Sequence, residues 1–276
     1  MKRTIAGIVV ATGLAQLAAA PAQAASLADP IKALKAVWTR GKAVNVVSTS
    51  KVDHGRGVSL TVAMDGTLGY GPAGEAAADV SETTQYSGNM AALARKGSDA
   101  DTVALEQTPV RIISSGHDDY ISGPVVDHAL PRGTTWVRYS RTGLPTSNLV
   151  VEILESDTLK TLLAHRTSYR DGVLKGTIKT DKLAKVSRRF AERYGASAKN
   201  PGTVTYAIWF SRTGLVQRLS ASAVLPRKDG TLRIQSETRF ADWEREITIP
   251  LPLEGDVLDR GQFGDELPRE APGTGN

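Results

Sequence analysis

The sequence contains no cysteine, only four histidines and few aromatic residues, which make up 5% of its 276 positions. The missing cysteine excludes disulfide bonds, cysteine-ligated zinc, iron–sulfur clusters and a thiol nucleophile. It also excludes a lipid anchor attached through a cysteine thioether. With 41% apolar and 23% charged residues, the chain has the composition of a globular protein that can bury a large core without covalent cross-links.

The sequence also lacks the short motifs that mark common catalytic and cofactor sites. It contains no nucleophile elbow, no phosphate-binding loop and no dinucleotide-binding glycine motif in a strand-to-helix context. The histidines, His54, His117, His128 and His165, form no i, i+4 pair that would place two metal ligands on one helix face. Two aspartates follow His117, but a polar turn between strands explains that cluster. We therefore expect no enzyme activity, no cofactor and no metal site.

The first 24 residues have the three parts of a secretory signal. Lys2 and Arg3 form a positive start, residues 5–17 form an apolar run, and residues 22–24 fit an A-x-A cleavage site. The apolar run is too short for a membrane-spanning helix. We therefore expect a secreted or extracytoplasmic protein of the cell envelope, while cleavage or retention of the signal stays open. Removal of the two signal cations lowers the formal net charge from +5 to +3, and the scattered arginines give no indication of nucleic-acid binding.

Periodic apolar residues predict the elements of the mature chain. A helix is expected from residue 30 to residue 41 with Asp29 as its N-cap, and a hairpin of strands 44–52 and 58–64 with a second turn at Asp65-Gly66. Further strands are expected at 108–114, 120–121, 134–139, 159–169, 173–180, 204–210, 215–223 and 231–240, and an edge strand with two prolines at 246–253. Helices are expected at 146–155 and 181–194. Residues 72–101 show no clear pattern.

The order of these elements defines a fold class. About nine to eleven strands and about three helices without βαβ alternation indicate an α+β fold with an antiparallel sheet. Long consecutive antiparallel strands twist and coil, so we expect a strongly curved sheet, a half-barrel, wrapped around a few amphipathic helices. A single domain is expected over residues 25–258, and a disordered tail over the Pro-, Gly- and acid-rich residues 259–276.

The predicted strands present more apolar surface inward than a few short helices can cover. This surplus predicts either a multilayer core or a cavity. Strand alternation gives the candidate lining residues of such a cavity: Val58, Leu60, Val62, Met64, Leu215, Leu219, Leu232 and Ile234. Small residues lie in the same inward registers and make room: Ser48, Ser50, Ala221, Ala223 and Ser236. A register shift of one residue would exchange the lining for the outer face.

The predicted helix at 181–194 carries a basic stripe opposite its apolar stripe. Its members are Lys182, Lys185, Arg188, Arg189 and Arg193. A solvated helix face explains most stripes of this kind. The alternative is docking against an anionic membrane surface, where each basic residue adds about 1 kcal/mol.

Short packing and turn signatures follow one another across some two hundred residues. They are PVRII at 109–113, YISGP at 120–124, LPRGTTWV at 130–137, YRDG at 169–172, GTI at 176–178, YAIWF at 206–210, FADW at 240–243 and ITIP at 247–250. In this order the chain from about residue 44 to residue 258 resembles the LppX/LprG-type lipoproteins of actinobacteria, distant relatives of the LolA and LolB carriers. The resemblance implies a half-barrel that encloses a hydrophobic cavity for the acyl chains of glycolipids or lipoproteins, and no catalytic residues. Those lipoproteins carry a lipobox cysteine at the signal cleavage site, where this chain has Ala24-Ala25.

Two functions of different classes remain open from the sequence. The first is an exported, monomeric, non-enzymatic carrier that binds a lipid or acyl chain, in which each buried methylene contributes about 0.8 kcal/mol. The second is an extracytoplasmic structural or sensory module with a filled core that recognises a protein partner. An apolar void distinguishes the carrier from the module. A hydrolase comes third, because it would need a buried histidine–carboxylate pair that the strand pattern does not predict.

Overall fold

The computed structural model describes residues 28–89, 91–92, 104, 106–140, 150–195, 200–228 and 230–267. The predicted signal segment lies outside these residues. The strands are β1 (Lys42–Gly55), β2 (Val58–Gly71), β3 (Gly74–Gly88), β4 (Val110–Ser115), β5 (Asp118–Ser122), β6 (Trp136–Ser140), β7 (Arg166–Arg170), β8 (Val173–Lys179), β9 (Thr203–Phe210), β10 (Val216–Arg227), β11 (Gly230–Glu246) and β12 (Val257–Asp259). The helices are α1 (Pro30–Val37), α4 (Pro124–Asp127), α5 (Ser156–Ala164), α6 (Thr180–Ala184) and α7 (Arg188–Tyr194), with 3-10 turns η1 (Glu254–Asp256) and η2 (Arg260–Gln262).

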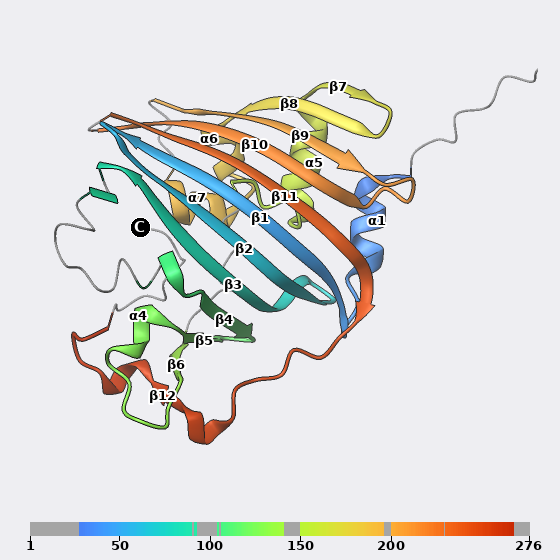
Figure 1. The fold of residues 1–276 in the computed structure, drawn as a ribbon. Helices are drawn as coiled ribbons and strands as arrows, with labels where there is room; N and C mark the ends of the chain where they lie inside the picture. The colour runs from blue at the N-terminus through green and yellow to red at the C-terminus, as the bar shows by residue number, and fades with distance from the viewer. Residues whose placement is uncertain are drawn as a thin grey trace, which may run out of the picture.

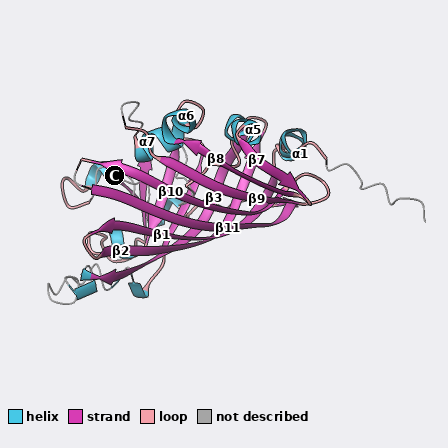
Figure 2. Cartoon of the chain, turned by 90° about the horizontal axis from the view of Figure 1, so that it is seen from above, coloured by secondary structure: helices cyan, strands magenta, loops and turns pink. Residues whose placement is uncertain are grey.

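The strands form one open, curved sheet with few helices, as the α+β class predicts (Figure 1). Their order is β12-β6-β5-β4-β3-β2-β1-β11-β10-β9-β8-β7, and every neighbouring pair is antiparallel except β12 and β6. Figure 2 shows α1, α5, α6 and α7 in a row along one face of this sheet. We call that face the inner face and the opposite one the outer face. None of the helices in the described ranges is long and apolar enough to cross a membrane.

The long hairpin of β1 and β2 forms as predicted, but β2 does not turn at Asp65-Gly66. Gly66 pairs with Val46 on one side and with Val80 on the other, so the strand continues to Gly71. A Cβ on Gly66 would collide with the backbone carbonyl oxygen of Asp79. The glycine therefore permits the close approach of β3, and it does not reverse the chain.

Helix α1 begins where the sequence predicts, because the Asp29 side chain accepts a hydrogen bond from the Ile31 backbone N–H at 2.9 Å. The predicted strand at 159–169 is wrong in its first half. Leu159 and Leu162 lie three residues apart on α5, and both are fully buried, so the helical period prevails over the strand reading. Of the helix predicted at 146–155, residues 150–155 contain no helix, and residues 146–149 lie outside the described ranges.

The single helix predicted at 181–194 is also wrong, since the chain forms two short helices, α6 and α7. They are separated by residues 185–187. Ser187 is fully buried, and its hydroxyl accepts a hydrogen bond from the Phe190 backbone N–H at 3.3 Å. Serine is a strong N-cap residue, so it starts a new helix at this point.

The C-terminal segment crosses the sheet to the far edge. Residues 247–253 contain no strand, in contrast to the predicted edge strand, because Pro250 and Pro252 remove backbone donors that a ladder needs. The segment packs Ile249 against a small cluster on β4, β5 and β6 and then adds β12 beside β6. Phe263 and Leu267, which the sequence places in the tail, are buried in the main core. The packed chain therefore extends at least to Leu267.

Candidate functional site

The inner face has a closed end near α1. Here the inward residues Val44 and Val46 of β1 and Leu68 of β2 are at most 1% exposed. The ring of Trp38, just after α1, lies 3.6 Å from the position that a Cβ on Gly74 would take. Residues 150–154, which include one glutamate among four apolar side chains, are all buried and belong to the cover of the core. The inner face of the sheet is therefore covered at the closed end by the protein's own side chains.

The opposite end of the same strands is open. Val52 of β1 pairs with Leu60 of β2, and Val62 lies one inward position further along β2. These three side chains, and Leu232 of β11, are half-buried, whereas their counterparts at the closed end are inaccessible. We call this group of four residues the open end.

A short polar band on β1 and β11 lies between the two ends, flanked by Met64 of β2 and Leu219 of β10. Ser48 of β1 and Thr238 of β11 face each other on the inner face, and their hydroxyls form a hydrogen bond of 2.9 Å. In the next row Ser50 pairs with Ser236. The buried Ser236 Oγ has no hydrogen-bond partner within the described ranges. Small side chains thus occupy the middle of the sheet, as the inward registers predict.

The predicted lining residues divide into fully buried and half-buried side chains, and Ile234, which pairs with Val52 of the open end, is among the buried ones. Met64, Leu219 and Ile234 are at most 1% exposed and belong to the main core. Val58, Leu60, Val62 and Leu232 are half-buried toward the open end. Leu215 lies in the β9–β10 turn beside Gly214, which approaches Ala28 and Ala33 near α1, so it is remote from the open end. The structure therefore brings together only part of the predicted lining.

The predicted basic stripe is not one continuous helix face. Lys182 and Lys185 are exposed on and just after α6, while the three arginines belong to α7. Arg189 is directed into the protein, where its Nη1 lies 2.9 Å from the Glu75 carboxylate. Arg188 forms an exposed ion pair with Glu192 at 2.6 Å. The break at 185–187 therefore separates the stripe, and membrane docking stays a prediction for the exposed lysines.

A buried tyrosine joins α5 to the sheet next to the polar band. The Tyr206 hydroxyl donates a hydrogen bond to the Leu162 carbonyl oxygen at 2.6 Å. Burial raises the pKa of Tyr206 to about 12, so the hydroxyl keeps its proton at physiological pH. This contact fixes the C-terminal turn of α5 over β9.

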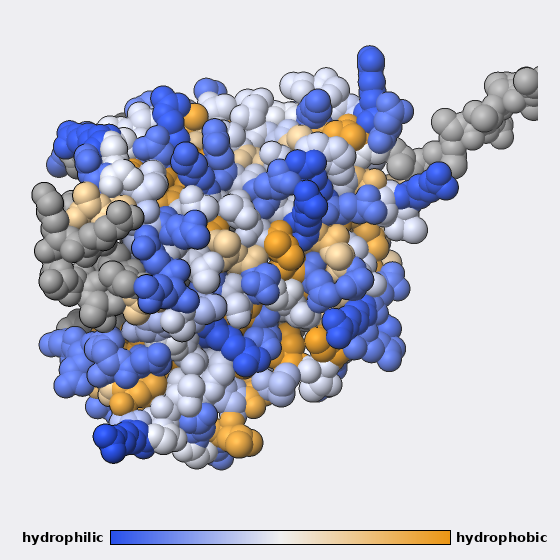
Figure 3. All heavy atoms as spheres, viewed as in Figure 1, coloured by the Kyte–Doolittle hydropathy of each residue, from blue (hydrophilic) through white to orange (hydrophobic). Residues whose placement is uncertain are grey.

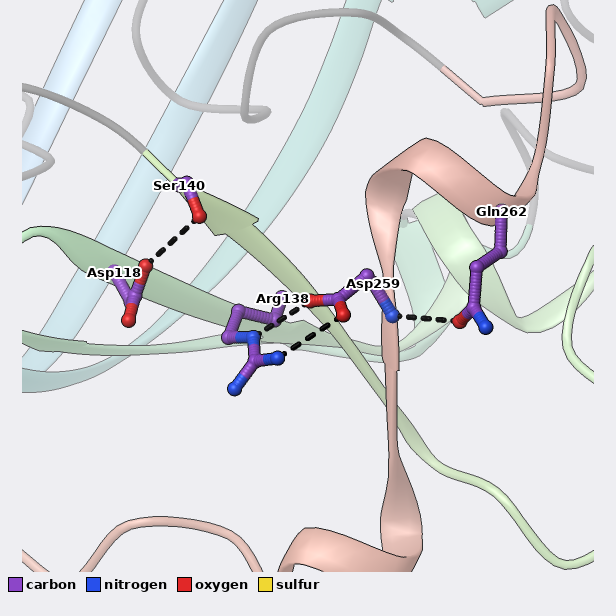
Figure 4. Close-up of polar contacts among 5 residues, drawn as sticks. All are labelled: Asp118, Arg138, Ser140, Asp259 and Gln262. Atoms are coloured by element: carbon purple, nitrogen blue, oxygen red, sulfur yellow. Dashed lines mark hydrogen bonds and ion pairs between the residues drawn. The ribbon is translucent and has the colours of Figure 1, made fainter.

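A surface hollow of about 490 Å³ lies at the far edge of the sheet, and Figure 4 shows the polar contacts among residues beside it. The Arg138 guanidinium binds the Asp259 carboxylate through two hydrogen bonds, of 2.6 and 3.0 Å. Ser140 donates to Asp118 at 3.0 Å, and the Asp259 backbone N–H donates to Gln262. The Arg138–Asp259 pair holds β12 against β6, while the other two contacts join β6 to β5 and cap η2, so all three have a structural role. Within the described ranges no three His, Asp or Glu side chains are arranged to hold a metal ion.

The protein is thus a large, curved and mostly antiparallel sheet whose inner face is covered at one end and half-exposed at the other. No family model matches the chain, and no curated protein matches it. Among solved structures, the chain is similar to a LolA superfamily protein from Nitrosomonas europaea, with 9% sequence identity and a TM-score of 0.25 over 79% of this chain and 93% of that chain. A TM-score this low does not define a shared fold, so the proposals below rest on the geometry of this chain.

Proposed function

We propose that the protein is an exported, non-enzymatic carrier of acyl chains or similar amphiphiles, and that the hydrocarbon binds at the open end. The observation that carries this proposal is the half-burial of Leu60, Val62 and Leu232 on the same inner face that is fully covered at its other end. Covering apolar surface contributes about 25 cal/mol per Å², so an aliphatic guest would gain where the protein leaves its own surface uncovered.

The polar band sets the expected depth of binding. A chain that lies along β1 and β2 would contact Val52 and Leu60 and then reach the row in which Val62 lies beside the hydroxyls of Ser50 and Ser236. Placing methylenes against hydroxyl groups gains little, and a hydroxyl that loses hydrogen bonds to water costs free energy. We therefore expect the hydrocarbon to stay at the open end, while the closed end keeps its native packing.

A matched pair of valines on the long hairpin tests the proposal. Val62 faces inward, whereas Val47 is 57% exposed on the outer face, which is mostly polar in Figure 3. In a titration with a dansyl-labelled fatty acid, Val62→Asp should weaken binding at least tenfold, because it places a charge where the chain binds. Val47→Asp should leave binding unchanged. Absence of binding to the parent protein, or equal loss in both variants, would contradict the proposal.

A second candidate is an extracytoplasmic module that binds a protein partner. It is favoured by the segment after β11, where Leu251 is 48% and Leu253 is 81% exposed. Contact surfaces are marked by contiguous exposed apolar patches, to which two such leucines would contribute. Native mass spectrometry of protein purified from its own host separates the two functions. Co-purified lipid supports the carrier, whereas lipid-free protein that also fails to bind the fatty acid supports the module.

A further inference from the structure

A second hollow lies apart from the open end, where α1, the β2–β3 turn and the start of α7 meet. Its volume is about 310 Å³. Trp38 and Glu75 contribute to its wall, and so do Glu152 of the buried 150–154 segment and Arg189 of α7. We call it the acidic cavity. Its size is that of a site for a small organic molecule.

The acidic cavity has more negative than positive groups. Four carboxyl groups and two guanidinium groups line it: Glu75, Glu152, Glu155, Asp157, Arg188 and Arg189. Both guanidinium groups already have carboxylate partners. Arg188 binds Glu192, and Arg189 lies 2.9 Å from Glu75 and 3.8 Å from Glu152. The cavity is therefore short of positive charge.

The buried groups in its wall show the same deficit. The Glu75 side chain is only 7% exposed, and its Oε1 has no hydrogen-bond partner within the described ranges. The Trp38 Nε1 is likewise buried and without a partner there. Burial raises the pKa of Glu152 to about 8, because Arg189 and Arg193 offset the desolvation only in part and the charges of Glu75 and Glu155 oppose ionisation. An unpaired buried acceptor and an unpaired buried donor each cost free energy unless a guest or water satisfies them.

We propose that the acidic cavity binds a small organic ammonium ion that carries an oxygen atom beside its amine, as in an amino alcohol. The ammonium would donate to Glu75 and lie against the Trp38 indole, which attracts cations to its ring face. The neighbouring oxygen would accept from the Trp38 Nε1–H. A metal ion does not fit this description, since the described carboxylates form no cluster of three that could ligate one. This site is independent of the acyl-chain site, because it lies by the closed end.

Isothermal titration calorimetry of the full chain with ethanolamine hydrochloride at pH 7 tests the site. We expect binding that releases protons, seen as a dependence of the heat on the ionisation enthalpy of the buffer, because a bound cation favours the charged form of Glu152. Glu75→Gln should weaken binding at least tenfold. The matched control is Glu254→Gln, an exposed carboxylate on η1, which should bind like the parent protein. Equal affinity in both variants, or no binding to the parent protein, would overturn the proposal.

A second variant tests the tryptophan N–H while keeping an aromatic ring at this position and leaving every buried charge in place. Trp38→Phe keeps an aromatic face but loses the N–H donor. The parent protein should bind ethanolamine more tightly than ethylamine, and Trp38→Phe should reduce that preference severalfold. Equal binding of the two amines by the parent protein would contradict the role of the oxygen acceptor. Circular dichroism of each variant verifies the fold.

The ammonium group could belong to a free amine or to the headgroup of an aminolipid, and vesicles distinguish these sources. Vesicles of phosphatidylcholine with phosphatidylethanolamine are compared with vesicles of phosphatidylcholine alone. If the parent protein is retained only by vesicles with phosphatidylethanolamine, and Glu75→Gln is not retained, the lipid headgroup is the source of the ammonium group. Binding of ethanolamine without retention by either vesicle identifies a free amine. If the protein neither binds ethanolamine nor is retained specifically by the first vesicles, the proposed site is wrong.

Discussion

The two ends of the β1–β2 hairpin carry the same alternating pattern but differ in what covers them. At one end Val44 and Leu68 are buried beneath the protein's own side chains. At the other end Val52 and Leu60 occupy equivalent inward positions and are half-buried. The polar band beginning at Ser48 lies between them. Strand alternation thus sets which face is apolar, whereas the placement of helices and of the 150–154 segment sets which part of that face is filled.

This difference separates a structural region from a region that is available to a guest. Burial of apolar surface at the closed end contributes to the free energy of folding. The equivalent apolar side chains at the open end are only half-buried, so they contribute less to the free energy of folding. Substitutions there can adapt the sheet to a ligand at a small cost in stability. The following predictions test that separation.

The largest expected effect is at the closed end. Leu68→Ala should lower the free energy of unfolding by about 3 kcal/mol, because removal of buried methyl groups loses transfer free energy and leaves a cavity. Urea denaturation followed by circular dichroism measures the loss. Val47→Ala on the outer face is the control, and it should change stability by less than about 0.5 kcal/mol. A loss below about 1 kcal/mol at Leu68 would show that the closed end is loosely packed.

The next effect depends on pH and concerns the cover of the closed end. Glu152 has a pKa of about 8 in the folded protein and an ordinary value near 4.5 when unfolded. In the folded protein Glu152 keeps its proton up to a higher pH than in the unfolded chain. Its contribution to stability is therefore complete below pH 4.5 and declines as the pH rises to about 8. The slope should be at most about 1.4 kcal/mol per pH unit. Glu152→Gln lacks this decline and should become the more stable protein as pH increases.

Urea denaturation at a series of pH values between 5 and 9 measures this difference. The useful quantity is the free energy of unfolding of Glu152→Gln minus that of the parent protein, since other titrating groups cancel. Glu254→Gln serves as the exposed control and should follow the parent protein at every pH. Parallel curves for the parent protein and Glu152→Gln would mean that Glu152 titrates normally.

The sequence predicts the sheet far better than its cover. Val44, Leu60 and Ile234 could be assigned to one face because a strand alternates with period two, and that period needs no knowledge of tertiary contacts. The helices were predicted poorly because they are short, and Ser187 could be read either as a position inside a helix or as the cap of a new one. The sequence gives no prediction of which inner-face residues remain exposed, because the segments that cover them lie far away in the chain.

The acidic cavity was missed for a related reason. Its members come from the β2–β3 turn, the 150–154 segment and α7, and no motif joins them in the sequence. One signal was present, because Glu152 interrupts an apolar run in which a charged side chain must be paired or neutralised. The sequence places its partner, Arg189, in a surface stripe only if residues 181–194 form one continuous helix. The break at Ser187 invalidates that assumption.

The smallest effect on stability, and the sharpest test of the comparison, is at the open end. Leu60→Ala makes the same chemical change as Leu68→Ala, on the same strand and the same face, eight residues away. Since Leu60 is only half-buried, the loss in free energy of unfolding should be about 1 kcal/mol or less, because little cavity is created. The variant should nevertheless bind the dansyl-labelled fatty acid more weakly, whereas Leu68→Ala should bind it normally under conditions where it is folded. If the two variants lose stability equally, the open end is packed as tightly as the closed end, and a guest hydrocarbon has no place there.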